Sequence, residues 1–503
     1  MKEFNLDTPL ISFANNNTGG MWTARNAVEG VQIFGGIGSG KTSGSGRMLA
    51  LKYLSHGFGG LVLTVKPDEK ELWEHYCAVA GRSDDLVVIE PHGKYVFNVL
   101  DYESRDGGIT DNVVQVLKTV MNASEEKSGG KSNDPFWDHA LDMLLFNVID
   151  LCKLAYGRVT FKDMYEIVQT LPTSETIYPQ DDNKGDAFMR AYLLAQKNAA
   201  QKTLAWLRQQ ETTGYPFPES ANNKEDFICD GVPEARLMKE IDTFFVETYA
   251  ELNEKTRSII DFSCSGFLFR LLREPVYSLF CKNESNITPD DCLNGKIILI
   301  NLPVKTHHKV GRDCQIMFKY IWQRAMEKRK DAQYGCPVFL WADEAQNFLH
   351  EYDADYQATA RSSRIATVYI SQNMPNYYAN MGGGKFEYKV KSFLGTLATK
   401  IFHANADVDT NKYASDLIGD IEYIENSKSS SFAGGMSSGT NRSLKIDCAV
   451  RPEEFVRLKT GTISNKNIVE AFIHVQGNPI KDGLNYSKVS FNQEYQLSLA
   501  HNL

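Results

Sequence analysis

The stretch that decides the fold runs from Val31 to Leu51 and reads VQIFGGIGSGKTSGSGRMLAL. It begins with a strand pattern, passes through a glycine-rich turn at Gly35–Thr42 and opens a helix. The turn has the spacing GxxxxGK[ST] in the context of strand and helix that this motif requires. Glycines let backbone N–H groups turn inward without a Cβ clash, and a helix start adds a positive dipole end. The segment therefore predicts a loop that binds phosphate groups.

Two side chains of this loop have predicted chemical roles. Lys41 is placed to reach the β- and γ-phosphates of a nucleotide, and Thr42 to ligate Mg²⁺. The expected cofactors are therefore ATP and Mg²⁺. The residues expected to bind the nucleotide are Gly35, Gly36, Ile37, Gly38, Ser39, Gly40, Lys41, Thr42 and Ser43.

The composition excludes several classes of protein. The 503 residues are 42% hydrophobic and 23% charged, which is typical of a globular chain and not of a disordered one. The net charge of -9 excludes a surface that is basic overall, so any nucleic-acid contact is expected to be local. We find no apolar run of about 18 residues and no signal-peptide pattern at the start of the sequence. Nine cysteines without CxxC spacing indicate reduced thiols, so we expect a cytoplasmic protein.

Short apolar runs elsewhere predict the strands of a sheet that is covered on both faces. Helical patterns lie between several of them, so the expected class is α/β with right-handed crossovers. The predicted strands are Val31–Phe34, Gly60–Val65, Leu86–Ile89, Ile297–Leu302, Val338–Ala342, Ala366–Ile370 and Leu397–His403.

One long gap breaks this alternation. Between about residues 104 and 284 the patterns are helical, at Phe136–Leu154, Ala187–Arg208 and Glu234–Leu252. We therefore predict a discontinuous nucleotide-binding domain over 1–105 and 285–503, with an all-α domain over 106–284 inserted into it. The low-complexity stretches Asn122–Asn133 and Ser427–Ser443 predict a mobile loop and a flexible segment.

A second motif complements the phosphate loop. The predicted strand Val338–Ala342 ends in Asp343 and Glu344. In phosphate-loop enzymes an acid at this place holds Mg²⁺, which is the role predicted for Asp343. A following acid orients and deprotonates the attacking water, which makes Glu344 the predicted general base.

A glutamine and an arginine near the next predicted strand complete the candidate catalytic set. Gln372 follows the run ending at Ile370 and is the predicted sensor of the γ-phosphate. An arginine from a neighbouring subunit can stabilise transition-state charge. Arg361 is the candidate for this role, and Arg364 is its direct rival.

These residues together resemble the type IV coupling proteins, the DNA-pumping ATPases of bacterial conjugation and type IV secretion, within the HerA/FtsK group of motors. The resemblance covers about residues 32 to 477, and its FNxL, PFW and KTRS elements are more specific than the two ATPase motifs. The elements that carry it are Gly35–Thr42, Lys66-Pro67-Asp68, Phe97-Asn98-Val99-Leu100, Pro135-Phe136-Trp137, Lys255-Thr256-Arg257-Ser258, Asn301-Leu302-Pro303, Asp343-Glu344 and Ser371-Gln372-Asn373.

The resemblance implies a RecA-like nucleotide-binding domain with an inserted all-α domain. It also implies six subunits around a channel, ATP at subunit interfaces, and a DNA or relaxase–DNA substrate moved through the channel towards a secretion system. Relaxase or effector cargo and a membrane-anchored secretion component are the further partners implied. Only about thirty residues precede the phosphate loop here, where family members usually carry membrane helices, and Lys66–Leu72 reads KPDEKEL in place of the family's DPKGE type.

These departures leave other functions open. The chain is expected in the cytoplasm, with a peripheral place at the inner face of the membrane as one alternative. A DNA-translocating ATPase that acts within the cytosol, in defence or in the processing of mobile elements, is a second alternative. A cargo receptor that uses ATP as an assembly switch is a third.

A local basic stretch supplies the predicted DNA contacts. It runs over residues 305–312 after the strand that ends near Pro303, and we expect it to form a loop facing the channel. Contacts to phosphates are independent of base sequence, as a motor requires. The predicted contacts are Lys305, Lys309, Arg312 and, in a second glycine-rich turn, Lys385.

Overall fold

The chain divides into two compact units. The computed structural model describes residues 3–13, 20–104, 110–126, 135–172, 186–213, 221–282, 284–329, 334–350, 352–380, 386–432, 436–477, 479–481 and 483–494. One unit comprises residues 1–88 and 289–503, and the other comprises residues 89–288. The sequence placed these boundaries at 105/106 and 284/285.

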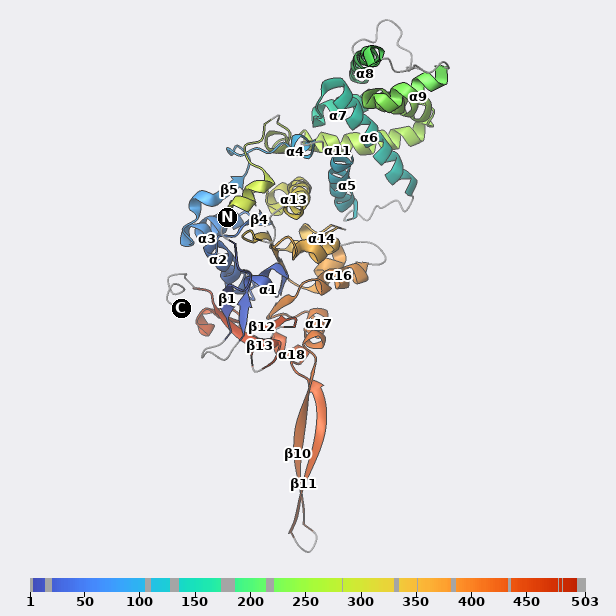
Figure 1. The fold of residues 1–503 in the computed structure, drawn as a ribbon. Coiled ribbons are helices and arrows are strands. Elements are labelled where there is room, and N and C mark those ends of the chain that lie inside the picture. Colours follow the sequence, from blue (N-terminus) through green and yellow to red (C-terminus); the bar gives the residue numbers. More distant parts are fainter. Residues whose placement is uncertain are drawn as a thin grey trace. The chain divides into compact units, whose positions relative to one another are not determined.

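The first unit is built on a nine-stranded sheet in the order β13-β12-β9-β3-β8-β7-β4-β6-β5 (Figure 1). The pairs β3–β8, β3–β9, β7–β8, β4–β7 and β4–β6 are parallel, and β12 and β13 extend the sheet antiparallel. The strands are β3 (Val31–Phe34), β4 (Gly59–Leu63), β5 (Leu86–Ile89), β6 (Ile297–Ile300), β7 (Val338–Ala342), β8 (Ile365–Ser371), β9 (Thr399–His403), β12 (Ile468–Val475) and β13 (Tyr486–Asn492).

All seven predicted strands are therefore present, which confirms the α/β class. A small second sheet pairs β1 (Pro9–Ser12) with β2 (Met21–Thr23). The helices of this unit are α1 (Ala24–Val28), α2 (Arg47–Ser55), α3 (Glu69–Val79), α13 (Val304–Glu327), α14 (Asp353–Ala360), α15 (Met374–Asn380), α16 (Phe386–Gly395), α17 (Val408–Ile418) and α18 (Pro452–Val456). Short turns of other helix types are η1 (Thr42–Gly46), η2 (Ser83–Asp85), η5 (Pro289–Asn294), η6 (Ala345–Asn347) and η7 (Ile463–Asn465).

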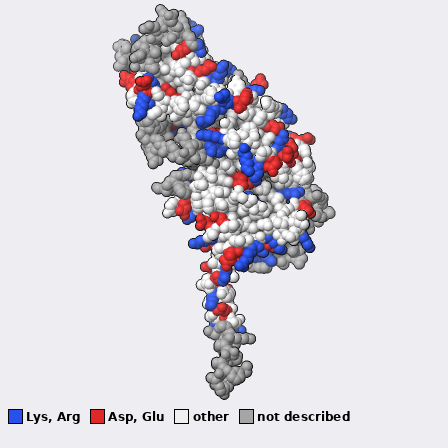
Figure 2. Space-filling model, turned by 180° about the vertical axis from the view of Figure 1, so that it is seen from behind, with Lys and Arg blue, Asp and Glu red and all other residues white. Residues whose placement is uncertain are grey.

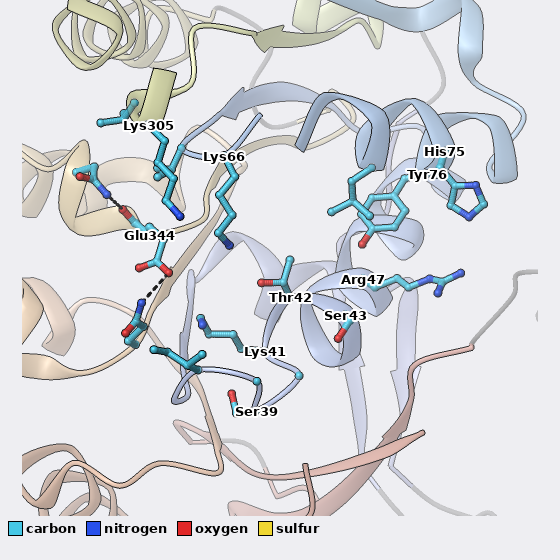
Figure 3. A pocket seen from close by; sticks show the side chains of 18 residues that line it. Ser39, Lys41, Thr42, Ser43, Arg47, Lys66, His75, Tyr76, Lys305 and Glu344 are labelled. Atoms are coloured by element: carbon cyan, nitrogen blue, oxygen red, sulfur yellow. Dashed lines mark hydrogen bonds between the residues drawn. The ribbon is translucent and has the colours of Figure 1, made fainter. Parts of the chain in front are cut away.

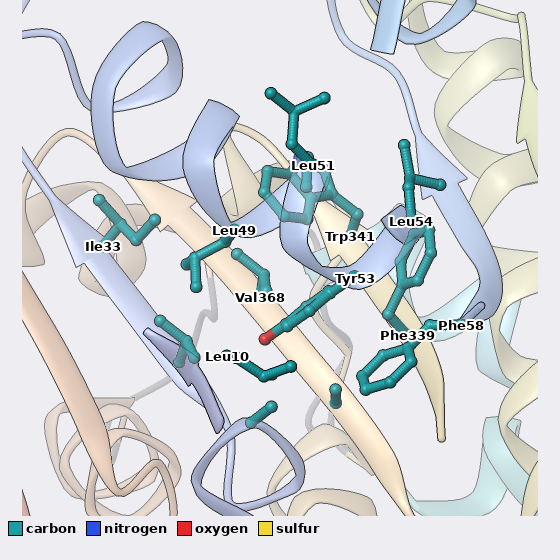
Figure 4. Packing of buried hydrophobic residues seen from close by; sticks show 14 of the residues in the cluster. Leu10, Ile33, Leu49, Leu51, Tyr53, Leu54, Phe58, Phe339, Trp341 and Val368 are labelled. Atoms are coloured by element: carbon teal, nitrogen blue, oxygen red, sulfur yellow. The ribbon is translucent and has the colours of Figure 1, made fainter. Parts of the chain in front are cut away.

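The core of this unit packs α2 against one face of the sheet (Figure 4). Tyr53 of α2 is fully buried and stacks on Phe58, with ring centroids 5.2 Å apart. Trp73 of α3 stacks on Phe339 of β7 at 5.6 Å. Because burial of one large side chain contributes about 1.5–3 kcal/mol, such contacts fix α2 and α3 firmly on the strands that lead into the site.

The second unit is helical throughout its described residues beyond β5, as the sequence predicted. The predicted helices at Phe136–Leu154 and Ala187–Arg208 correspond to α6 and α8, and Glu234–Leu252 corresponds to α10 followed by the π-helical turn η4. The elements are α4 (Val99–Ser104), α5 (Thr110–Glu126), α6 (Pro135–Tyr156), α7 (Phe161–Gln169), α8 (Ala187–Thr213), α9 (Ala221–Gly231), α10 (Pro233–Asp242), η4 (Thr243–Tyr249), α11 (Glu254–Leu271) and α12 (Val276–Phe280). No described helix of either unit is both long and apolar enough to cross a bilayer.

Two low-complexity predictions need correction. The segment Ser427–Ser443 was expected to be flexible, but β10 (Asp420–Phe432) and β11 (Met436–Cys448) form a long antiparallel ribbon through it. The ladder begins among strand-favouring residues such as Ile421 and Ile424 and continues in register into the serine-rich part, because backbone pairing does not depend on apolar side chains. The predicted mobile loop Asn122–Asn133 is helical up to Glu126, and its remaining residues lie outside the described ranges.

Candidate active site

A cavity of about 740 Å³ lies beyond the carboxyl ends of the parallel strands (Figure 3). Since β3, β8, β7 and β4 are neighbours in the sheet, the segments that follow them meet at one edge. The lining residues come from the phosphate loop, from α3, from the start of α13 and from the segments after β4, β7 and β8. They are Ile37, Gly38, Ser39, Gly40, Lys41, Thr42, Ser43, Arg47, Val65, Lys66, Leu72, His75, Tyr76, Val304, Lys305, Glu344, Asn347 and Gln372.

The phosphate loop has the backbone that its glycines predict. Gly38 has φ +72° and Gly40 has φ +80°, a region that side chains with a Cβ rarely adopt. A Cβ at Gly40 would also lie 2.4 Å from Cγ1 of Val469 on β12. Seven of the nine predicted nucleotide-binding residues, from Ile37 to Ser43, line the cavity. Gly35 and Gly36 precede them in the same loop and are not among the described lining residues.

The helix that follows the loop starts with a wide π-helical turn, η1. The N–H of Gly46 donates to the carbonyl of Lys41 at 2.9 Å. Ser45 Oγ lies 2.7 Å from Nε2 of His403, which is completely buried at the end of β9. Burial lowers the pKa of His403 to about 3, so its imidazole is neutral at pH 7. A neutral side chain therefore braces the turn that presents Lys41 and Thr42.

Thr42 and Asp343 meet as the magnesium-site prediction requires. Thr42 Oγ1 donates to Oδ2 of Asp343 at 2.9 Å, and the backbone N–H of Glu344 donates to Oδ1 of Asp343 at 2.9 Å. A hydroxyl and a carboxylate are oxygen donors of the kind that Mg²⁺ selects beside phosphates. These residues fit a magnesium ion held between the loop and the end of β7.

Glu344 is held in a defined position at the rim of β7. Its backbone is left-handed, with φ and ψ both 50°, a conformation that is unusual for a residue with a side chain. Gln346 Nε2 donates to one carboxylate oxygen at 2.8 Å, and Gln372 Nε2 donates to the other at 3.1 Å. Ser371 in turn donates to Gln346 at 3.0 Å. The sequence placed Gln372 as a phosphate sensor; in the structure its amide contacts Glu344 at the cavity wall.

The chain that follows Glu344 is anchored to α13 by a buried ion pair. Nζ of Lys319 lies 2.6 Å from Oδ2 of Asp353, and both side chains are fully buried. Lys319 also donates to the carbonyl of Phe348 at 2.8 Å. The N–H of His350 donates to Oδ2 of Asp353 at 2.7 Å. Phe348, His350 and Asp353 are thereby fixed on α13, which limits the freedom of the turn that carries Glu344.

The two rival arginines have different environments. Arg361 follows α14, its side chain is 61% exposed, and Nη1 lies 3.5 Å from Glu29. Arg364 is buried and donates from Nη1 to the carbonyls of Phe4 at 2.7 Å and Gly335 at 3.0 Å. The guanidinium of Arg364 thus binds backbone carbonyls within the same chain, whereas the guanidinium of Arg361 is accessible at the surface.

The predicted DNA-contacting loop is not a loop. Residues 304–327 form α13, with a kink at His308. Lys305 lines the nucleotide cavity, Lys309 is exposed, and Arg312 is only 9% exposed and is paired with Asp313 at 3.2 Å. The burial of Arg312 counts against a role in DNA contact, and Lys385 lies outside the described residues. On the face drawn in Figure 2, Lys and Arg side chains of the described chain are interspersed with Asp and Glu.

Several lining residues were not predicted. Arg47, His75 and Tyr76 lie on the opposite side of Thr42 from Glu344 (Figure 3). Only the three-dimensional packing of α3 beside the loop brings His75 and Tyr76 to the cavity. Lys66 was noted in the sequence only as part of a motif, and its Nζ lies 3.8 Å from Oδ2 of Asp343.

Comparisons with known proteins bear on the family and the fold. Residues 337–460 match the family described as the TraM recognition site of TraD and TraG. No curated protein matches the sequence significantly. The resemblance to type IV coupling proteins is confirmed.

Solved structures of the bacterial conjugative coupling protein TrwB share the fold. The unbound monoclinic form of TrwBΔN70 has a TM-score of 0.58 at 12% identity, over 98% of this chain and 96% of that one. TrwB with the non-hydrolysable GTP analogue GDPNP has a TM-score of 0.60 at 13% identity, over 99% and 92%. TrwB with ADP and Mg²⁺ has a TM-score of 0.59 at 12% identity, over 99% and 96%. The fold is RecA-like, with an inserted all-helical domain.

Proposed function

We propose that this chain is an ATP-hydrolysing motor that recruits DNA or a relaxase–DNA conjugate and translocates it in conjugative transfer or type IV secretion. The observation that carries the proposal is the joining of the loop residue Thr42 to Asp343, 301 residues later, at 2.9 Å. This contact places the phosphate-binding and acid motifs around one cavity. TrwB, which has the same fold, is known in complexes with ADP and Mg²⁺ and with the ATP analogue ADPNP.

ATP binds with its phosphates on the loop. The N–H groups around Gly38 and Gly40 point towards the phosphate oxygens, and Lys41 binds the β- and γ-phosphates. Thr42 and Asp343 hold Mg²⁺, which when bound neutralises charge on the phosphate oxygens. The nucleoside extends from the loop towards Arg47 and Tyr76, the other end of the cavity.

Hydrolysis proceeds by attack of water on the γ-phosphorus. Glu344 accepts a proton from the water as its oxygen bonds to phosphorus, and the bond from phosphorus to the β–γ bridging oxygen breaks, releasing ADP and phosphate. Gln346 and Gln372 fix the carboxylate for this transfer by donating to both of its oxygens. Gln372 also links the γ-phosphate region to the end of β8 and so acts as the sensor.

Arg361 acts on the nucleotide of a neighbouring subunit in a homo-oligomer, which we propose is a hexamer. Its exposed guanidinium supports this role, while the two backbone carbonyls bound by Arg364 argue against the rival. An arginine in trans couples each hydrolysis step to the relative position of two subunits. Such coupling is what a translocating ring requires.

The test is ATP turnover of the purified chain with and without DNA. We expect DNA to stimulate turnover, and we expect the chain to displace a third strand from a DNA triplex only when ATP is hydrolysed. Lys70→Met on α3 changes a lysine outside the lining of the cavity and serves as a control variant, which should keep the ATP turnover of the wild type with and without DNA. If DNA does not change the rate of ATP turnover, the proposal of a DNA motor is contradicted, and a receptor that uses ATP as an assembly switch is favoured.

A further inference from the structure

Lys66 brings an additional amine into the cavity between the phosphate loop and the acid motif. In Figure 3 its side chain enters from above between Thr42 and Glu344, and Lys41 of the phosphate loop lies below it. The ammonium lies 3.8 Å from Oδ2 of Asp343, the same oxygen that accepts the hydrogen bond from Thr42. A cation therefore stands at the oxygen that faces the predicted magnesium position.

The backbone before Lys66 is held by four hydrogen bonds with three residues. Gln315 of α13 accepts from the N–H of Thr64 at 2.6 Å and donates to its carbonyl at 2.9 Å. The N–H of Lys305 donates to the carbonyl of Val65 at 3.0 Å. The N–H of Val65 donates to Glu69 at 2.7 Å. The backbone from which the Lys66 side chain extends into the cavity is therefore fixed.

The surroundings keep Lys66 charged. Asp343 lies 3.8 Å from its ammonium, and an opposite charge at this distance favours the charged form. Glu69 is itself buried, and its second carboxylate oxygen has no hydrogen-bond partner among the described residues. The side chain of Lys66 is nevertheless 34% exposed, on the cavity side. It is a charged donor that is free to meet an anion.

We propose that Lys66 is a second phosphate-binding lysine, which leaves Asp343 when Mg²⁺ binds there and donates to the terminal phosphate of ATP. This inference rests on the proposed function and deepens it. Lys41 contacts the phosphates from the loop side, and Lys66 contacts the terminal phosphate from the side of Asp343 and Glu344. The exchange follows from charge, because Lys66 and Mg²⁺ compete for one oxygen while the arriving phosphate offers new acceptors beside it.

A terminal-phosphate contact has a definite binding signature. Lys66 would contribute to the affinity for a triphosphate and not to the affinity for ADP, which lacks the acceptor. A lysine that only competes with Mg²⁺ for Asp343 would instead weaken metal binding in the wild type, and its removal would change the affinities for the two nucleotides equally. The ratio of the two affinities separates these roles without any measurement of turnover.

The experiment compares Lys66→Met with the wild type by calorimetric titration of ADP and of ADPNP, each with Mg²⁺, and by electron paramagnetic resonance titration of Mn²⁺ in the presence of ADP. We expect K66M to weaken ADPNP binding about tenfold or more, with ADP changed less than about twofold, as for loss of one charge-assisted hydrogen bond. Lys66→Arg, which keeps the charge, recovers most of the lost affinity. Lys70→Met, with Lys70 paired to Glu74 at 3.9 Å on the adjacent helix, leaves both affinities at wild-type values.

Each outcome decides the matter. An ADPNP-to-ADP affinity ratio in K66M equal to that of the wild type overturns the inference. Tighter Mn²⁺ binding with that unchanged ratio shows that Lys66 only competes with the metal for Asp343. If K66M does not fold by circular dichroism, Lys66→Gln provides the same comparison. Wild-type protein that binds neither nucleotide would contradict the proposed function itself. If the wild type binds both nucleotides and K66M has the same ratio of ADPNP to ADP affinity, only the inference about Lys66 is contradicted.

Discussion

The two walls of the cavity are built by different means. The loop wall, Ile37–Ser43, is mainly backbone whose shape depends on positive φ at Gly38 and Gly40. The opposite wall consists of side chains after β4, β7 and β8, and hydrogen bonds and a buried ion pair fix them in place. A backbone wall suits the binding of any polyphosphate, whereas side chains in fixed positions suit proton transfer and sensing. Nucleotide binding is thus assigned to one wall and proton transfer to the other, so substitutions in one wall should affect one of these functions more than the other.

The largest expected effect separates ATP hydrolysis from nucleotide binding. Glu344→Gln removes the proton acceptor and keeps the shape, so we expect turnover to fall by about 10³-fold while ATP affinity stays close to wild type. Lys41→Ala on the loop wall is expected to lose nucleotide binding itself. Single-turnover hydrolysis and fluorescent-nucleotide binding measure the two effects. Near-normal turnover in E344Q would remove Glu344 from its role.

The next prediction compares two arginines, one of which is proposed to act on the nucleotide of a neighbouring subunit. Arg361→Ala is expected to lower turnover by about 10³-fold with unchanged stability. Arg364→Ala is expected to cost about 1–3 kcal/mol of unfolding free energy, because two carbonyls lose their donor. Mixing R361A with K41A chains tests the action in trans, since mixed rings contain some sites with both residues. A mixture without any recovered turnover would contradict a shared site.

The buried ion pair of Lys319 with Asp353, which anchors the wall opposite the loop, gives a stability prediction. Lys319→Met leaves Asp353 buried without its partner, so the unfolding free energy should fall by about 3–5 kcal/mol. The exposed pair of Lys391 with Glu387, 2.7 Å apart on α16, is the control, and Lys391→Met should leave stability unchanged. Urea unfolding measures both variants. Equal losses in the two variants would show that the buried pair does not anchor this wall.

The smallest predicted effect concerns the brace behind the loop wall. The pKa of His403 is about 3 in the folded chain and its ordinary value is 6.5, so the unfolded chain binds more protons between these values. Stability therefore decreases as the pH falls from 7 to 5, by about 2 kcal/mol for this residue. The free energy of unfolding of His403→Gln should fall by about 2 kcal/mol less than that of the wild type between pH 7 and 5. Parallel pH dependences of the two proteins in urea unfolding would exclude this contribution.

Sequence patterns were most informative where function depends on neighbouring residues along the chain. The loop Gly35–Thr42 and the pair Asp343–Glu344 each carry their chemistry within a few positions. Apolar runs likewise identify seven short strands of the sheet. The long-range contacts have no such signature. Nothing near Lys319 in the sequence indicates its pairing with Asp353, 34 residues later, or its complete burial.

The wrong predictions have one physical cause, which is that charge and low complexity do not fix exposure or conformation. Arg312 belongs to a basic stretch, yet the packing of α13 buries it beside Asp313. The serine-rich segment after Asn426 lacks apolar alternation, yet it continues a ladder that starts at Asp420. Tertiary packing and strand pairing decided both, and neither is encoded locally.

The most direct test of the central claim is a crystal or cryo-electron microscopy structure of E344Q with ATP and Mg²⁺. The account predicts an intact triphosphate on the loop, Mg²⁺ between Thr42 and Asp343, and the side chain of residue 344 facing the terminal phosphate. A triphosphate bound elsewhere, or a cavity that stays empty at saturating ATP, would contradict it.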